Sequence, residues 1–78
     1  MEESIFIENV KKQFIDANDI ELGIDSEFKQ IGSYDSLTGM TIIVMLKDEY
    51  NIDISEEDFR KIKTVKELFD YVNLRATI

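Results

Sequence analysis

Apolar residues recur at intervals of three and four along four stretches of the chain, a spacing typical of amphipathic helices. Three of these stretches are long enough for several helical turns, whereas the third in order is short. The pattern predicts an all-α fold: a four-helix bundle of three longer helices and one short third helix, with a long loop between helices one and two. The expected helices cover residues 4–17, 36–50, 55–61 and 64 onwards.

Capping residues mark the expected helix starts. Ser4 is a suitable N-cap for the first helix, and Ser55 for the short third helix, whose first turn is acidic as the helix dipole favours. Thr64 and Glu67 have the spacing of a capping box at the start of the last helix. The expected core positions of these three helices are Phe6, Ile7, Val10, Phe14, Ala17, Phe59, Ile62, Val65, Leu68, Phe69 and Val72.

Residues 18–35 show no sustained periodicity and are rich in turn-forming residues. A loop of this length in a small domain is uncommon and is usually either disordered or functional. Apolar residues recur within it, so we expect an ordered loop that lies across the bundle. The expected anchors are Ile20, Leu22, Ile24, Phe28 and Ile31.

The second helix carries two apolar stripes, although a helix that covers a core needs only one. The inward stripe is expected to contain Gly39, Ile42, Ile43, Leu46 and Tyr50. The second stripe then faces outward, and a clustered apolar patch bordered by charge is typical of a partner-binding surface. The alternative is a central helix that is buried on both sides. The outward residues are Leu37, Met40 and Val44, with Thr41 and Asp48 at the edge of the stripe.

Composition favours one small domain over residues 1–78, which we expect to be a monomer. The chain has no Cys, so neither a disulfide nor a thiolate metal site can stabilise it. We see no signal peptide or membrane-spanning segment, and expect a cytoplasmic protein that does not insert into membranes.

The formal net charge is −8, and residues 16–58 hold twelve acidic residues but two basic ones. This charge argues against nucleic-acid binding, which depends on Lys and Arg side chains that neutralise phosphates. It favours partners that present a basic surface. A solvated acidic surface that only keeps the domain soluble is the alternative.

Catalysis by this chain is not expected. The chain has no His to activate Ser36, and the neighbouring Asp35 is better placed to cap a helix than to act as a base. A calcium loop that begins at Asn51 fails on spacing, because Glu56 and Ile62 occupy the positions of its Gly and its last Glu. We therefore predict a non-catalytic protein without a metal site.

The tripeptide Asp35-Ser36-Leu37 precedes the second helix and is the one place where chemistry is expected to begin. With Asp35 as N-cap, its carboxylate accepts a hydrogen bond from the backbone of Leu37 or Thr38, and Ser36 becomes the first helical residue. A phosphodiester on Ser36 lies at the positive end of the helix dipole. The alternative is an ordinary cap followed by an ordinary serine.

The chain resembles an acyl carrier protein of the free-standing bacterial type. The resemblance covers nearly the whole length and is strongest from Ile31 to Val72, around Asp35-Ser36-Leu37, residues 42–55 and residues 64–72. It implies that Ser36 carries 4′-phosphopantetheine, which a separate phosphopantetheinyl transferase transfers from coenzyme A. The thiol of this arm holds acyl intermediates as thioesters for fatty acid, specialised lipid or polyketide biosynthesis. Carriers of this kind can shelter the cargo between helices; Gly39 leaves room for it or allows close helix packing.

The resemblance also has departures. Thr38 and Thr41 occupy positions where carriers of fatty acid synthesis usually have acids, and Tyr34 replaces a small aliphatic residue. Gly39-Met40 is also unusual. These departures favour a specialised carrier that serves a dedicated pathway.

The expected partners are the transferase and acyl-loading, synthase or acyltransferase enzymes with basic docking patches. Two alternatives remain open: an aminoacyl or peptidyl carrier, and an unmodified helical interaction module. The expected cofactor site is Ser36 with Asp35 and Leu37 beside it, and the expected docking residues are Leu37, Met40, Val44, Asp48, Glu56, Glu57 and Asp58.

Overall fold

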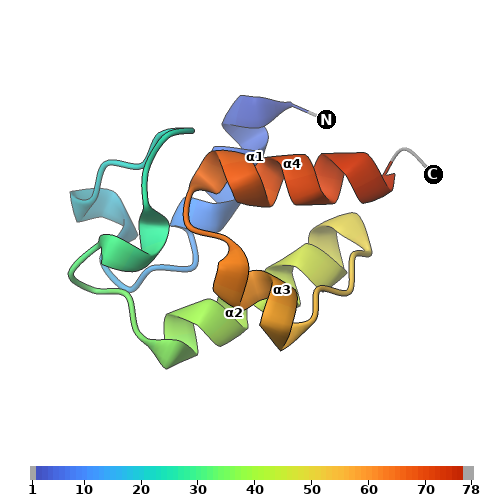
Figure 1. Cartoon of the computed structure of the whole chain (residues 1–78). Helices are drawn as coiled ribbons and strands as arrows, with labels where there is room; N and C mark the ends of the chain where they lie inside the picture. Colours follow the sequence, from blue (N-terminus) through green and yellow to red (C-terminus); the bar gives the residue numbers. More distant parts are fainter. Residues whose placement is uncertain (1, 77–78) are drawn as a thin grey trace.

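The computed structural model describes residues 2–76, which form four α-helices joined by turns and contain no strand. The helices are α1 (Glu3–Lys11), α2 (Ser36–Tyr50), α3 (Glu56–Lys61) and α4 (Val65–Ala76). Helices α1, α2 and α4 pack against one another, and α3 lies beside α2 (Figure 1). The predicted all-α bundle with a short third helix and a long first loop is confirmed.

Helix α1 differs from its prediction at both ends. It begins at Glu3, with Glu2 as a cap residue that makes no side-chain hydrogen bond, so the prediction of Ser4 as N-cap is wrong. It ends at Lys11, and not near Ala17, because the N–H groups of Gln13 and Phe14 bond to carbonyls three residues back. The tighter turn still directs Phe14 into the core.

The long loop is ordered and tied to α4, as its apolar anchors predict. Phe28 is fully buried, within a short 3-10 turn, Phe28–Gln30. The carbonyls of Ile24 and Ser26 accept hydrogen bonds of 2.7 and 3.0 Å from the N–H groups of Lys66 and Val65. The loop therefore satisfies free backbone donors at the start of α4. The other predicted anchors, partly buried against the core, are Ile20, Leu22, Ile24 and Ile31.

Helix α2 has the predicted bounds, and its termination explains the change of direction after it. Asn51 adopts the left-handed conformation (φ 56°), and the N–H of Ile52 reaches back to the carbonyl of Leu46. Asn tolerates this conformation better than most residues. The chain therefore turns at Asn51, and Ile52 and Ile54 in the segment that follows are buried in the core.

The caps of the last two helices agree with their predictions. The Ser55 hydroxyl accepts a hydrogen bond from the N–H of Asp58 at 3.1 Å. Thr64 and Glu67 form the reciprocal pair of a capping box, with bonds of 3.1 and 2.9 Å. Among the described helices, none has the length and apolar character that crossing a membrane requires.

The burial of Phe28 predicts that the loop contributes to global stability. Phe28→Ala should lower the free energy of unfolding by about 3–5 kcal/mol, because it leaves a cavity among packed aromatic rings. Urea denaturation measures this change. Ile15→Ala is the control: Ile15 is 93% exposed, so its truncation should change stability little. If Phe28→Ala lowers the free energy of unfolding no more than Ile15→Ala does, the loop is not part of the core.

Candidate functional site

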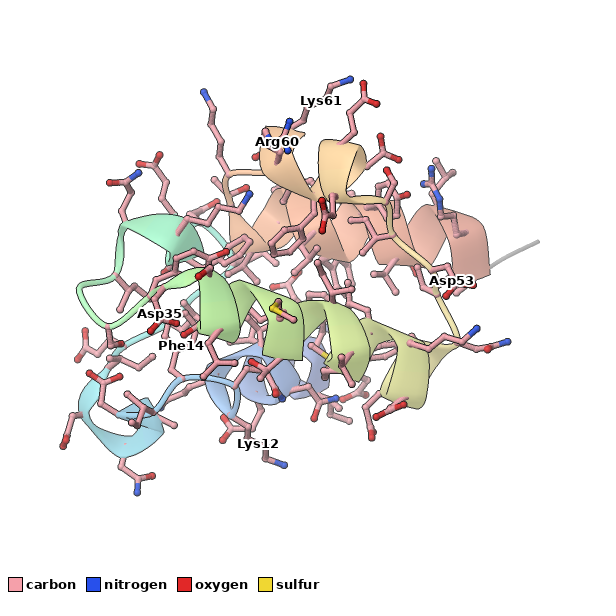
Figure 2. The ribbon with its side chains drawn as sticks, turned by 90° about the horizontal axis from the view of Figure 1, so that it is seen from below. Lys12, Phe14, Asp35, Asp53, Arg60 and Lys61 are labelled. Carbon is pink, nitrogen blue, oxygen red and sulfur yellow. The ribbon has the colours of Figure 1, made fainter. Side chains whose placement is uncertain are left out.

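The start of α2 is held by two hydrogen bonds to one carboxylate. Oδ1 of Asp35 accepts from the backbone N–H of Thr38 at 2.8 Å and from the Thr38 hydroxyl at 2.9 Å. The predicted N-cap is thus present. The second bond, from the Thr38 hydroxyl, was not predicted from the sequence. Thr38 is buried, whereas Asp35 is exposed at the end of the helix (Figure 2).

Ser36 is the first residue of α2, is exposed, and has a hydroxyl without a hydrogen bond among the described residues. The neighbouring serines are engaged in structure. Ser26 accepts from the N–H of Gly23, Ser33 donates to Asp16 at 2.6 Å, and Ser55 caps α3. The Ser36 hydroxyl is therefore accessible to another molecule.

The outward stripe of α2 is exposed as predicted. Leu37, Met40 and Val44 are 67%, 62% and 56% exposed, which excludes a helix buried on both sides. They border a hollow of about 520 Å³ between α1 and α2, here called the α1–α2 groove. Its full lining is Asn9, Lys12, Gln13, Leu37, Met40, Thr41, Val44, Met45, Asp48 and Glu49.

The acids proposed for docking do not line one hollow. Asp48 lines the α1–α2 groove with the apolar residues, whereas Glu56 lines a different hollow. Glu57 forms an ion pair of 3.6 Å with Lys61, and Asp58 accepts a hydrogen bond of 2.9 Å from the Tyr71 hydroxyl. Glu57 and Asp58 therefore have partners within the domain.

A second hollow, of about 360 Å³, lies beside Ser36 between α2 and α3 and is here called the α2–α3 groove. Gly39 belongs to its wall, but the space next to Gly39 is not empty. A Cβ added to Gly39 would lie 2.6 Å from the Tyr34 hydroxyl oxygen, so a side chain fills the room expected for cargo or for a helix. The groove is lined by Lys29, Tyr34, Ser36, Gly39, Met40, Ile43, Glu56, Phe59 and Arg60.

The α2–α3 groove is lined by two cations, Lys29 and Arg60, and by one acid, Glu56, although the chain as a whole is acidic. Lys29 bonds through its Nζ to the carbonyl of Phe59 and lies over the Phe59 ring, 4.4 Å from its centroid. Burial lowers the pKa of Lys29, and the nearby charge of Arg60 lowers it further, although Glu67 opposes this. Burial, with the charge of Asp35, raises the pKa of Tyr34. Figure 2 shows Arg60 on α3, on the other side of α2 from Lys12.

Several site residues were missed by sequence reasoning. Lys29 and Arg60 belong to separate elements, and only folding brings them to the wall that carries Ser36. Lys12, the C-cap residue of α1, adds a positive charge to the α1–α2 groove. No periodic signal joins such residues. Within residues 2–76, no three acidic side chains lie close enough together to hold a metal ion.

Comparison with known proteins agrees with this geometry. A family model described as "Phosphopantetheine attachment site" matches residues 7–72. The chain is 35% identical over 63 residues to acyl carrier protein 4, chloroplastic, of Arabidopsis thaliana. The alignment covers 81% of this chain and 45% of that relative, so the chain spans under half of the relative's length.

The chain belongs to the phosphopantetheine attachment site family, and its cofactor is 4′-phosphopantetheine. Together, the family and the relative support the role of an acyl carrier. Proteins of this family are generally non-catalytic and interact with phosphopantetheinyl transferases and synthase enzymes. A free-standing bacterial type, a cytoplasmic location and a monomeric state stay predictions.

The residues at the start of α2 fit this cofactor. A phosphodiester needs an exposed hydroxyl for attachment and benefits from a helix N-terminus, and Ser36 offers both on a helix of 15 residues. When attached, the arm supplies a terminal thiol, which this chain lacks.

The doubled cap predicts how the site responds to acid. The bonds from the N–H and hydroxyl of Thr38 lower the pKa of Asp35. Such a group stabilises the fold above its unfolded pKa, and this contribution is lost as the pH falls through the folded pKa. Thr38→Val retains the N–H but not the hydroxyl, so the pKa of Asp35 should rise towards its ordinary value. A carboxyl NMR titration measures the change.

Thr41→Val is the matched control for this titration. The Thr41 hydroxyl donates to the backbone carbonyl of Thr38 at 2.8 Å and not to the carboxylate. The control should leave the pKa of Asp35 unchanged. Equal shifts in both variants would contradict a direct hydroxyl–carboxylate bond.

Proposed function

We propose that this chain is a non-catalytic acyl carrier with Ser36 as the attachment residue for 4′-phosphopantetheine. The arm's thiol holds the acyl group as a thioester. We further propose that Leu37, Met40, Val44 and Asp48 form the main docking surface for the enzymes that load and use the carrier. We infer a single carrier domain, since the family match covers residues 7–72 of one helical bundle.

One observation carries the assignment of Ser36: this residue is exposed and its hydroxyl makes no hydrogen bond among the described residues, whereas the other serines of the matched region are hydrogen-bonded. Within the matched residues 7–72, the other serines are Ser26, Ser33 and Ser55, and each makes a hydrogen bond that fixes a turn, a loop or a cap. Modification of any of these hydroxyls would disturb that bond. Modification of Ser36 disturbs none among the described residues.

The local chemistry supports a carrier that is acted upon by a separate enzyme. Attachment forms a bond from Oγ of Ser36 to the pantetheine-bearing phosphorus of coenzyme A and breaks the P–O bond of its pyrophosphate. Adenosine 3′,5′-bisphosphate leaves, and the hydroxyl proton must go to a base. Asp35 is adjacent, but its carboxylate is held by Thr38 and its pKa is lowered, which makes it a weak base. With no His in the chain, the base belongs to the transferase.

The docking surface follows from exposure and position. Leu37 and Val44 expose apolar side chains along the helix that begins with Ser36, and Asp48 adds a negative charge further along. An enzyme that approaches Ser36 along α2 covers this apolar surface, and a basic rim on the enzyme suits the acid. Glu56 lies in the α2–α3 groove, so we assign it a secondary place.

We propose that the carrier serves a dedicated pathway of specialised lipid or polyketide synthesis. Thr41 lines the α1–α2 groove with an uncharged side chain, whose hydroxyl is bonded to the Thr38 carbonyl, at a position where the resemblance leads us to expect an acid. Thr38, the other departure, is buried against Asp35. An acid at that position would therefore meet the cap and not a docking enzyme, so Thr41 is the change that bears on partners.

Attachment at Ser36 predicts a simple mass change. Incubation with a phosphopantetheinyl transferase and coenzyme A should raise the intact mass of the native chain by one phosphopantetheine, and Ser36→Ala should abolish the gain. Ser33→Ala is the control, because Ser33 is close in sequence but bonded to Asp16, and it should retain the full gain. A mass gain in Ser36→Ala would refute this assignment.

The docking surface predicts a kinetic effect without a structural one. Leu37→Ala and Val44→Ala should each lower kcat/KM of the transferase by about tenfold, because truncation of a central apolar contact costs more than about 1 kcal/mol of binding energy. Thermal unfolding should change little, since both side chains are exposed.

The control for docking is Ile5→Ala. Ile5 is a similarly exposed apolar residue, but it lies on α1 and lines neither groove. Its truncation should leave kcat/KM unchanged. If all three variants behave alike, the outward face of α2 is not the docking surface.

A further inference from the structure

The α2–α3 groove is the apolar space nearest to the proposed attachment residue. Gly39, Ile43 and Phe59 supply its wall on the side of the core, and Ser36 lies at its edge. An apolar group tethered to Ser36 is favoured to leave water for such a space. The depth of the groove therefore bears on which cargo the carrier shelters.

Tyr34 closes this groove on the inner side. The point where a Cβ of Gly39 would lie is 2.6 Å from the Tyr34 hydroxyl oxygen and 3.5 Å from the edge of the Phe59 ring. Tyr34, Phe59 and the backbone of α2 therefore meet at one place. The gap between α2 and α3 is filled there, and the groove remains open to solvent.

The Tyr34 ring is fixed by its neighbours. Its centroid lies 6.1 Å from that of Phe28, in an edge-to-face arrangement, and 6.3 Å from that of Phe14. Phe28 is in turn 6.0 Å from Phe59. Both Phe14 and Phe28 are buried in the core, so a displacement of Tyr34 would disrupt aromatic contacts there.

Gly39 is the partner that this arrangement requires. Any larger residue at position 39 would place its Cβ too close to the Tyr34 hydroxyl, whereas glycine lets the ring rest against the helix. The two departures from the usual pattern, Tyr34 and Gly39, are therefore one structural feature. The large residue fills the space that the small one leaves.

We propose that Tyr34 is a specificity-determining residue that limits the sheltered cargo to short acyl groups. The inference rests on the proposed attachment at Ser36. With Tyr34 packed on Gly39, an acyl chain cannot pass inward between α2 and α3, so only its first carbons are buried and the rest of a long chain lies in the open groove, exposed to solvent or to the partner enzyme.

The test compares short and long cargo on the full chain. The native protein, Tyr34→Val, Tyr34→Leu and Tyr34→Phe are loaded by a promiscuous transferase from butanoyl- or dodecanoyl-coenzyme A, and intact mass verifies the loading. Cleavage of each thioester by hydroxylamine is then followed by mass spectrometry. The native chain and Tyr34→Phe, which keeps the ring, should lose both cargoes at the same rate.

The smaller side chains should open the groove. In Tyr34→Val and Tyr34→Leu, the dodecanoyl thioester should be cleaved about tenfold more slowly than the butanoyl one, the factor expected for burial of roughly two more methylene groups. Tyr50→Val is the matched control. Tyr50 is a half-buried aromatic residue of α2 that packs on Phe6 and does not line this groove, so its loss should create no dependence on chain length.

Two results would overturn the proposal. One is slower cleavage of the long cargo in the native chain, which would show that Tyr34 does not limit the groove. The other is equal cleavage of both cargoes in the Tyr34 variants that circular dichroism shows to be folded. Absence of loading at Ser36 would instead count against the proposed function, so the two failures are distinguishable.

Discussion

The carboxylate of Asp35 determines how the functional surface is presented. Its two bonds to Thr38 fix the residue at which α2 begins. A start displaced by one position would change the backbone conformation at Ser36 and Leu37, whereas the buried Ile42 and Leu46 hold the rest of α2 in its orientation. The observed start keeps Ser36 and Leu37 exposed and puts Gly39 against Tyr34. The geometry of the proposed attachment residue depends on that start.

Much of the fold could be predicted from the sequence because helical periodicity and caps are local signals. Helix α2 begins and ends where its apolar stripes do, and the caps at Asp35, Ser55 and Thr64 follow from side chains close in sequence. The exposure of Leu37 and Met40 follows from the same periodicity, since two stripes cannot both face one core. The capping interaction at the candidate site could therefore be predicted from the sequence alone.

The remainder depends on contacts between residues far apart in the sequence. Helix α1 ends earlier than predicted because Gln13 and Phe14 form a tighter turn, and the spacing of apolar residues does not indicate where such a turn begins. Lys29 and Arg60 approach one groove from different elements, and Tyr34 reaches Gly39 only because Phe14 and Phe28 hold its ring. These arrangements are set by packing, and packing has no signature at fixed spacing.

Met40 lines both the α1–α2 groove and the α2–α3 groove, so one flexible thioether forms a shared wall. A substitution at Met40 would therefore disturb enzyme docking and cargo shelter together, and its phenotype would not show which of the two is impaired. Val44 borders only the first groove, and Ile43 only the second. Adjacent positions on one helix thus allow the two tasks to be separated genetically, whereas oxidation of the Met40 sulfur would impair both at once.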